Sequence, residues 1–478
     1  MYDDIKNGLF SAPEVYAQRF SGKDNSPQEY RTMFMRDRDR ILYSKSFRRL
    51  SGKTQIYLTG ADDHQRNRLT HTLEVSQIAS SISQALGFNR DLTEAIAIGH
   101  DLGHTPFGHA GEQALHLLMI PNSQNKISDS PFNHADFCDN EHMGFKHNLH
   151  SVRMAVSLEN IYGDAGLDLT NYTLWGIQRH SSPIYSKEKI DVKYLIPTFY
   201  KQYKQYYFIK NNNEKLAWSF EAFVVAEADE IAQLHHDLEY AIRGNAMSRF
   251  DVLKTVKNAL WSIMSECDKE TYGKMKSSTL DEETFIVLLS RIVVNTLVSL
   301  LIKNSLLNLN VLKEKYCINS ENRSEFFLQV DPNLNEIKTA ISYSIFGDST
   351  EIFKKLRKYS KTISTKVHNS YVVQRMNTKG QYVIRKLFQA YYSNPQQLPN
   401  HSLVQYLIST GEYQTKSSVM KAMSARGEGI VRTKFMDSRK KKEADSIENK
   451  VKLMRTIADH IAGMTDSYAL EEFERLYN

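Results

Sequence analysis

The chain has 478 residues, of which 41% are hydrophobic, so it can form one large core with appendages or two to three domains. A formal net charge of +6 suits an anionic ligand or a nucleic-acid surface without requiring either. Three separated cysteines with no CxxC pair, and an N-terminus without a secretory pattern, predict a cytoplasmic protein. Only ten prolines and no sustained apolar alternation predict an all-α fold.

Residues 29–58 form a dense basic segment that also carries apolar residues at helical spacing, among them Ile41, Phe47 and Leu50. One interpretation is a helix with a solvated basic face. The other is a basic segment, within residues 1–60, that contributes to a functional site.

The next stretch, residues 68–119, has the pattern of three helices. The first follows a 3.6-residue apolar period and ends at Gly87. The second runs from about Leu92 to His100, and Gly103 and Pro106 then mark a break. The third helix begins within FGHAGEQALHLLM.

The remaining chain alternates between helical pattern and polar segments. Residues 121–140 and the end of 186–215 are expected to be irregular, and the charged stretch 424–448 is expected to be a mobile loop. Helices are expected over 142–178, from Ser219 to Arg243, and beyond residue 250.

Residues 285–302 are the most membrane-like part of the chain. Arg291, Asn295 and Thr296 interrupt this apolar run, and an arginine at that depth is costly in lipid. We therefore expect a buried helix and no membrane association.

Four side chains have the chemistry of a divalent metal site. His100 and Asp101 are adjacent at the end of a helix, so both can reach one ion. His71 lies on the preceding helix, and Asp229 interrupts an apolar helix where a carboxylate is costly without a cation. These four residues are the candidate metal ligands.

The helix that carries Asp229 also has a polar stripe. Gln233, His236 and Asp237 follow Asp229 at offsets of 4, 7 and 8, which puts all four on one face. The stripe faces either solvent or a site, and the apolar residues flanking it on both sides favour a site.

A proton-transfer pair is predicted directly after the metal residues. His109 and Glu112 are three residues apart at the start of a helix, a spacing at which a carboxylate orients a histidine for general acid or base work. His104 lies in the turn between these two groups. It either caps the turn or belongs to the site.

Six segments together resemble the HD-domain deoxynucleoside triphosphate triphosphohydrolases, the dGTPase-like family. They occur in the family's order and cover most of residues 30–245 and part of the C-terminal half. They are RDRDRILYSKSFRRLSGKTQIY (around 36–57), NRLTHTLEVSQIA (67–79), GHDLGHTPFGHAGEQAL (99–115), GFKHNLHSVR (144–153), ADEIAQLHHDLEYAI (228–242) and the weaker YVIRKLFQAYYSNPQQLP (382–399).

The resemblance implies an HD-domain helical core with additional C-terminal helices. It also implies metal-dependent hydrolysis of a dNTP, dGTP foremost, to deoxynucleoside and inorganic triphosphate, by attack of water on the α-phosphorus. By motif, the metal ligands are His71, His100, Asp101 and Asp229, the catalytic residues are His109, Glu112 and His104, and the substrate-binding residues are Gln55, Arg68, His147 and Asp237. Two further residues are expected to bind substrate: Lys53, as a basic group that holds the triphosphate, and Gln233, at the position of a sugar-packing tyrosine.

Three positions depart from the family pattern. Many members have a basic residue and a sugar-packing tyrosine where this chain has Glu230 and Gln233, and several have Gln where it has His150. The exclusion of ribonucleotides must therefore be arranged differently in this chain.

The resemblance further implies a catalytic core over 61–250, a C-terminal helical region over 251–478 and a homo-oligomer, as in hexameric relatives. Histidine and carboxylate ligands suit Mn²⁺ or Mg²⁺, and also Fe, Co or Ni. A nucleotide effector or single-stranded nucleic acid is a further expected partner.

Two alternatives remain open at this stage. One is an HD phosphohydrolase that acts on another nucleotide or a phosphodiester. The other is a nucleic-acid-binding protein that uses residues 31–53 and a basic cluster, Arg439, Lys440, Lys441 and Lys442.

Overall fold

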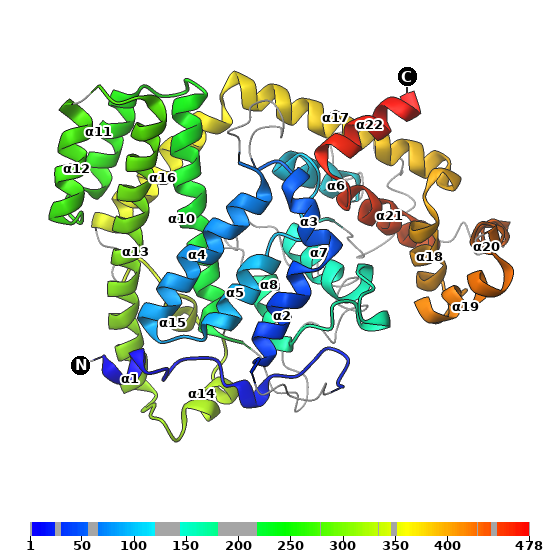
Figure 1. The fold of residues 1–478 in the computed structure, drawn as a ribbon, viewed down its shortest axis with the longest axis horizontal. Helices are drawn as coiled ribbons and strands as arrows, with labels where there is room; N and C mark the ends of the chain where they lie inside the picture. The colour runs from blue at the N-terminus through cyan, green and yellow to red at the C-terminus, as the bar shows by residue number, and fades with distance from the viewer. Residues whose placement is uncertain are drawn as a thin grey trace.

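The computed structural model confirms the all-α fold (Figure 1). It describes residues 2–23, 30–55, 66–119, 144–179, 218–277, 279–332, 334–345, 351–427, 429–440 and 447–477. The predicted loops over 121–140 and 186–215, and Lys441 and Lys442, lie outside these residues. Within them the chain forms helices and short helical turns, and the only β-type pairings are two isolated bridges.

The first half of the chain contains the helices α1 (Asp3–Lys6), α2 (Met33–Leu42), α3 (Lys45–Arg49), α4 (Arg68–Leu86), α5 (Arg90–Gly99), α6 (Gly108–Leu118), α7 (His147–Arg153), α8 (Asn171–Arg179) and α10 (Phe220–Arg243). The second half contains α11 (Arg249–Leu260), α12 (Glu266–Ser277), α13 (Glu282–Lys315), α14 (Arg323–Gln329), α15 (Asn335–Lys338), α16 (Glu351–His368), α17 (Tyr371–Ser393), α18 (Asn400–Ser409), α19 (Lys416–Arg426), α20 (Gly429–Lys440), α21 (Ile447–Ala462) and α22 (Asp466–Tyr477).

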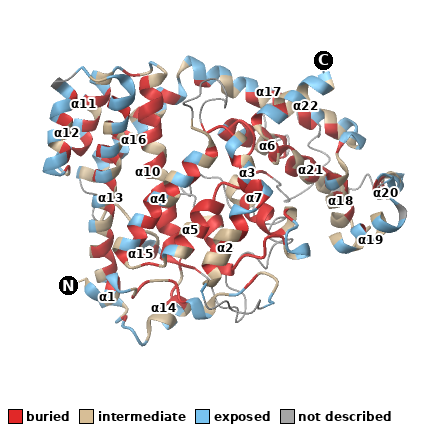
Figure 2. Cartoon of the chain, in the orientation of Figure 1, coloured by how far each residue is buried: buried red, intermediate tan, exposed pale blue. Residues whose placement is uncertain are grey.

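The central helices α4, α5 and α10 begin and end where their sequence dictates. The side chains of Asn67 and Asn89 accept hydrogen bonds from the first turns of α4 and α5. α4 ends at Gly87, whose φ of 73° lies in the left-handed region. A Cβ there would lie 2.3 Å from the carbonyl oxygen of Lys6, so only glycine fits. Figure 2 shows that most residues of these three helices are buried.

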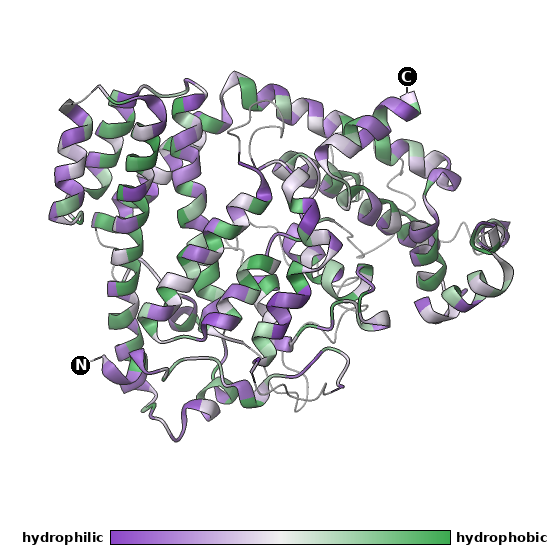
Figure 3. Ribbon diagram, viewed as in Figure 1, coloured by the Kyte–Doolittle hydropathy of each residue, from purple (hydrophilic) through white to green (hydrophobic). Residues whose placement is uncertain are grey.

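The largest hydrophobic core is built around α4, α5, α10 and α13, and we call it the main core. It includes Ile5, Val75, Ile96, Val225 and Val293. Apolar faces turn toward this core and hydrophilic faces turn outward (Figure 3). The main core contains residues from both sides of positions 60 and 250, so the proposed domain boundaries stay predictions.

The predicted buried helix lies within α13. Among the described helices, α13 is the one long and apolar enough to cross a membrane by length and composition. However, Leu289, Ile292 and Leu301 are buried in the main core. The side chain of Asn295 donates to Asp268, and that of Asn308 donates to the backbone at Ala340. α13 therefore packs as a core helix of the fold.

A second core, the C-terminal core, joins α6 to helices from the last hundred residues. It includes Phe107, Leu115, Phe388, Leu407 and Ile457. In Figure 1, α17 runs from the α16 side of the molecule to α21 and α22. Residues of α6 thus belong to one core and residues of α4, α5 and α10 to the other.

The expectation of a mobile loop over 424–448 is wrong for part of that stretch. Residues Gly429–Lys440 form α20, and α21 begins at Ile447. Val431 and Phe435 are buried in the C-terminal core. Because they are four residues apart, they share one face of a helix, and their packing orders a segment in which charged residues outnumber apolar ones.

The basic segment is only partly solvated. Arg40 is buried and lies 3.0 Å from Asp168, while Arg38 contacts Glu94 at 2.9 Å. The segment is thus held to the core by ion pairs.

A buried ion pair joins α7 to α21. The guanidinium of Arg153 donates to both carboxylate oxygens of Asp459 at 2.6–2.9 Å. Burial alone would raise the pKa of Asp459, but Arg153 and His150 hold it well below its ordinary value.

Asp459→Ala is expected to lower the free energy of unfolding by about 3–5 kcal/mol, because it leaves Arg153 buried without its carboxylate. Since the folded pKa of Asp459 lies below the unfolded value, its contribution is complete above that ordinary value and is lost as the pH falls below it. Urea unfolding at several pH values measures both effects. The exposed pair of Glu471 and Arg475 is the control, and Glu471→Ala is expected to cost about 0.3–0.5 kcal/mol. Equal losses for the two variants would contradict this role for Asp459.

Candidate active site

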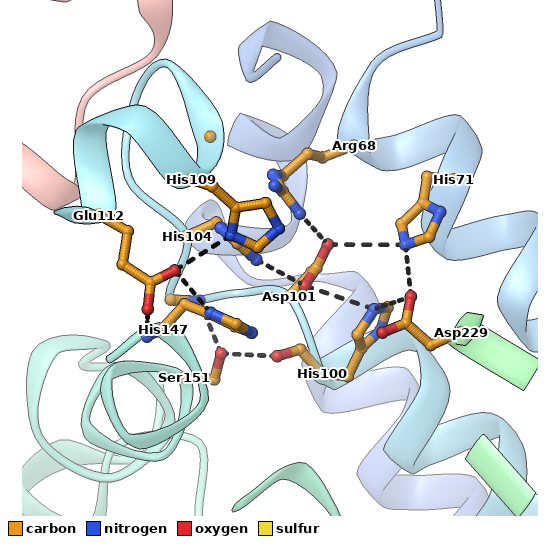
Figure 4. Close-up of polar contacts among 12 residues, drawn as sticks. Arg68, His71, His100, Asp101, His104, His109, Glu112, His147, Ser151 and Asp229 are labelled. Atoms are coloured by element: carbon orange, nitrogen blue, oxygen red, sulfur yellow. Dashed lines mark hydrogen bonds and ion pairs between the residues drawn. The ribbon is translucent and has the colours of Figure 1, made fainter. Parts of the chain in front are cut away.

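The four predicted metal ligands converge on one point (Figure 4). His71 projects from α4, His100 and Asp101 follow the end of α5, and Asp229 projects from α10. One oxygen of Asp229 lies 3.0 Å from Nε2 of His71 and 4.0 Å from Nε2 of His100. The ligand atoms of His71, His100 and Asp101 all lie within 4.8 Å of one another.

The ring of His100 is oriented by its backbone. Its Nδ1 lies 2.6 Å from the carbonyl oxygen of Ala97, so Nδ1 carries the proton and donates it. Nε2 is then the unprotonated nitrogen, and it lies 3.4 Å from a carboxylate oxygen of Asp101. This tautomer is the one that a metal-binding histidine needs.

Both carboxylates are ionised despite their surroundings. Burial alone would raise the pKa of Asp101, but His100, His104 and Arg68 hold it well below its ordinary value. Burial and the charge of Asp101 would also raise the pKa of Asp229, but His71 and His100 hold it below its ordinary value. Two carboxylates and two imidazoles that share one point fit a divalent cation, which would relieve the repulsion between Asp101 and Asp229.

Arg68 adds a cation to the same point. Its Nη1 lies 2.5 Å from Asp101, while Nε and Nη2 are buried with no hydrogen-bond partner among the described residues. Buried guanidinium groups of this kind bind phosphate oxygens well. Arg68 therefore has the geometry of a phosphate-binding residue.

A cluster of three histidines and one carboxylate adjoins Asp101. Nε2 of His104 lies 3.2 Å from Asp101, and the ring of His104 stacks on His147 with 3.8 Å between centroids. Nδ1 of His147 lies 2.9 Å from Glu112, and Nδ1 of His109 lies 3.4 Å from the same oxygen. Glu112 therefore orients two histidines, where the sequence suggested one.

Exposure and charge separate the members of this cluster. The side chain of His109 is 64% exposed, whereas Glu112 and His104 are buried. Burial, followed by the charges of Arg68 and His147, holds the pKa of His104 well below its ordinary value, so His104 is neutral. Burial alone would raise the pKa of Glu112, but His147 and His109 hold it low. An ionised Glu112 beside an exposed His109 suits proton exchange with a ligand.

Three of the predicted substrate-binding residues, Gln55, Gln233 and Asp237, form a hydrogen-bonded chain. Nε2 of Gln55 donates to Gln233 at 2.9 Å, and Nε2 of Gln233 donates to Asp237 at 2.9 Å. Burial raises the pKa of Asp237 to about 7. Gln233 thus joins two residues that the sequence placed far apart.

Lys53 has a different setting from the other candidate residues. Its Nζ donates to the carbonyl oxygens of His104 and, at 2.8 Å, of Ala462. Burial lowers the pKa of Lys53 to about 7. Lys53 thus ties the turn that carries His104 to the end of α21.

The turn between α5 and α6 is held by residues that sequence reasoning missed. Ser151 accepts from the amide of Gly103 at 2.8 Å and donates to the carbonyl oxygen of His100 at 2.7 Å. A Cβ at Gly103 would lie 2.2 Å from the amide nitrogen of Ser151, so α7 can approach this closely only against glycine. The GFKHNLHSVR segment contains Ser151 but gave no sign of this role.

Asp466, at the start of α22, is a second support. It accepts from the amide of Phe107 at 2.9 Å and from both the amide and the hydroxyl of Thr54. Phe107 has a φ of 62°, a strained value for a residue with a large side chain. Asp466 therefore joins the segment of Gln55 to the turn that begins α6. No local sequence signal marks Asp466.

Comparisons with known proteins agree with this geometry. Residues 68–232 match the HD domain family, and residues 348–420 and 412–475 match the phosphohydrolase-associated domain family. Together with the site, these matches define the chain as an HD-domain phosphohydrolase, a metal-dependent class.

The chain belongs to the deoxyguanosinetriphosphate triphosphohydrolase-like family. It is 30% identical over 453 residues to the protein of that name from Rickettsia rickettsii (strain Iowa), covering 94% of this chain and 92% of that protein. It is also 30% identical to the proteins of that name from Bartonella tribocorum and Geobacter metallireducens, over 459 and 454 residues, which in each case cover 94% of this chain and 90% of the relative.

Proposed function

We propose that the chain hydrolyses dNTPs, dGTP foremost, to the deoxynucleoside and inorganic triphosphate. The observation that carries this proposal is the adjacency of two groups. The candidate metal-ligand atoms of four residues lie together beside the cluster of His109 and Glu112. These four residues are His71, His100, Asp101 and Asp229. One group suits an ion bound to phosphate, and the other suits transfer of a proton to or from a group next to that phosphate.

The four donors would hold a divalent ion, Mn²⁺ or Mg²⁺ foremost, with Fe, Co or Ni as further candidates. When bound, such an ion polarises a phosphate oxygen and lowers the pKa of water. The buried Nε and Nη2 of Arg68 would bind oxygens of the triphosphate. The triphosphate would thereby be held with its α-phosphorus near His109.

His109 would carry the proton in the chemical step. Water attacks the α-phosphorus, and the bond to the nucleoside 5′-oxygen breaks. His109, oriented by Glu112, would give a proton to that oxygen or take one from the water. His104 and His147 would line the phosphate side, because both stack beside Asp101.

The chain of Gln55, Gln233 and Asp237 would bind the sugar. Amide and carboxylate groups in a row can exchange hydrogen bonds with a 3′-hydroxyl. With Gln233 in place of a tyrosine, ribonucleotides would be excluded by this hydrogen-bonded row and not by an aromatic ring.

We further propose that the chain is a cytoplasmic homo-oligomer, a hexamer by the family resemblance, and that a nucleotide effector or single-stranded nucleic acid regulates it. The net charge of +6 supports a negatively charged effector.

The decisive experiment incubates the purified chain with each dNTP and rNTP in Mn²⁺ or Mg²⁺ and resolves the products. We expect deoxynucleoside and inorganic triphosphate, with dGTP consumed fastest. Monophosphate plus diphosphate, or hydrolysis of a phosphodiester alone, would instead support the alternative of an HD phosphohydrolase with another substrate.

A further inference from the structure

A second group of metal-ligating side chains lies next to His71. Nε2 of His235 lies 3.2 Å from Oε2 of Glu74, and Nε2 of His236 contacts the same oxygen. The ligand atoms of these three residues all lie within 4.8 Å of one another. The ring centroid of His236 lies 5.3 Å from that of His71, so the two groups are neighbours.

The two groups come from the same pair of helices but share no ligand. Glu74 follows His71 by three residues on α4, and His236 follows Asp229 by seven on α10, so each pair shares a helix face. The packing of α4 against α10 that brings His71 to Asp229 therefore also brings Glu74 to His236.

Both histidines of this second group are buried, and Nδ1 of each has no hydrogen-bond partner among the described residues. The side chain of Glu74 is 33% exposed, which leaves a route for an ion and room for water ligands. Two imidazoles and one carboxylate are ligands that Mn²⁺, Fe²⁺ and Zn²⁺ accept.

The charges around Glu74 also admit a cation. Arg66 lies 3.0 Å from the other oxygen of Glu74 and contacts Glu239, and Arg243 contacts both Glu239 and Glu283. Three carboxylates thus face two guanidinium groups, so the network keeps one negative charge. Arg66 occupies Oε1 and leaves Oε2 to the two histidines.

We propose that Glu74, His235 and His236 bind a second divalent transition-metal ion, separate from the ion of the first site. This site goes beyond the proposed hydrolysis, because it involves none of the residues assigned to that reaction. The competing explanation is that the three side chains form hydrogen bonds that only hold α4 to α10.

Metal stoichiometry separates these explanations. The full chain is stripped with a chelator, equilibrated with Mn²⁺ or Zn²⁺ alone, and analysed for bound metal per chain. We expect two ions in the wild type and one in Glu74→Gln. Asp229→Ala is also expected to retain one ion, that of the second site. Glu94→Gln is the matched control, because Glu94 contacts Arg38 and Arg90 but no histidine, and it should keep two ions.

His235→Asn is the second variant, so that the test does not depend on the folding of Glu74→Gln. Circular dichroism identifies which variants fold, and anomalous scattering from crystals of the metal-loaded chain locates the ions directly. One ion in the wild type, or two in a folded Glu74→Gln or His235→Asn, would overturn the proposal. One ion with dNTP hydrolysis would overturn only this inference, and two ions without hydrolysis would overturn only the proposed function.

Discussion

Asp229→Ala is expected to lower the rate of dNTP hydrolysis by at least about 10³-fold and to empty the first metal site. Asp229 supplies one of two carboxylates in that site, and its oxygen lies 3.0 Å from His71. A catalytic metal contributes several kcal/mol to transition-state stabilisation, and each 1.4 kcal/mol is about tenfold in rate. Elemental analysis and initial rates of triphosphate release measure the two effects.

A carboxylate outside the site is the control for this variant. Asp251 is exposed at the start of α11, so Asp251→Ala should keep both the metal and the rate. Near-normal metal content at the first site in Asp229→Ala would remove Asp229 from the ligand set. A full rate without that metal would contradict metal-dependent hydrolysis.

His109→Ala is expected to slow hydrolysis by about 10²–10⁴-fold while the metal content stays unchanged. Its side chain is the exposed member of the cluster, and Glu112 orients it at 3.4 Å. Glu112→Gln should cause a loss in the same range, because it removes the charge that holds the histidine. The double variant should lose little more than either single one, since the two residues act as a unit.

His147 provides the sharpest comparison, because it lies closer to Glu112, at 2.9 Å. If His147→Ala abolishes turnover while His109→Ala retains it, the proton carrier is His147. Gln113→Ala is the control on α6, the helix of His109 and Glu112, since Gln113 is exposed and contacts Gln381. It should leave the rate unchanged.

The sequence indicated that the four predicted metal ligands lie close together, because they lie on helices or directly follow one; their binding of a metal stays a prediction. His71 and Asp229 are at the positions where polar residues interrupt apolar faces, and helix periodicity determines which way such residues point. His100 and Asp101 follow the end of α5, where adjacent side chains reach one point. For the same reason the boundaries of α4 and α10 were predicted to within a residue or two.

The supports of the site were not predictable from local pattern. Asp466 reaches Thr54 across 412 positions, and Asp459 reaches Arg153 across 306. Such contacts depend on how α21 and α22 pack against the rest of the fold. Helical periodicity cannot predict them, because it describes the faces of one helix at a time. The charge of Lys53 likewise gave no sign that its ammonium group donates to backbone carbonyls of two distant segments.

The charged stretch that contains α20 shows a second reason why prediction from sequence can fail. Its composition indicated disorder, because charged residues outnumber apolar ones. Val431 and Phe435 are spaced as on one face of a helix, but a spacing between two residues is weak evidence for a helix. The residues that they pack against in the C-terminal core lie on other helices. Tertiary packing decided the outcome there.

The contact of Asp466 with Phe107 and Thr54 makes the final helix a support of the candidate active site. A nonsense mutation or a protease cut that removes residues 463–478 would spare every histidine of the HD motif yet release the loop of Gln55 and the strained bend before α6. An excised fragment of residues 68–232 would lack both Asp466 and the segment of Gln55. Activity should therefore be as sensitive to damage at the last helix as at the four predicted metal ligands.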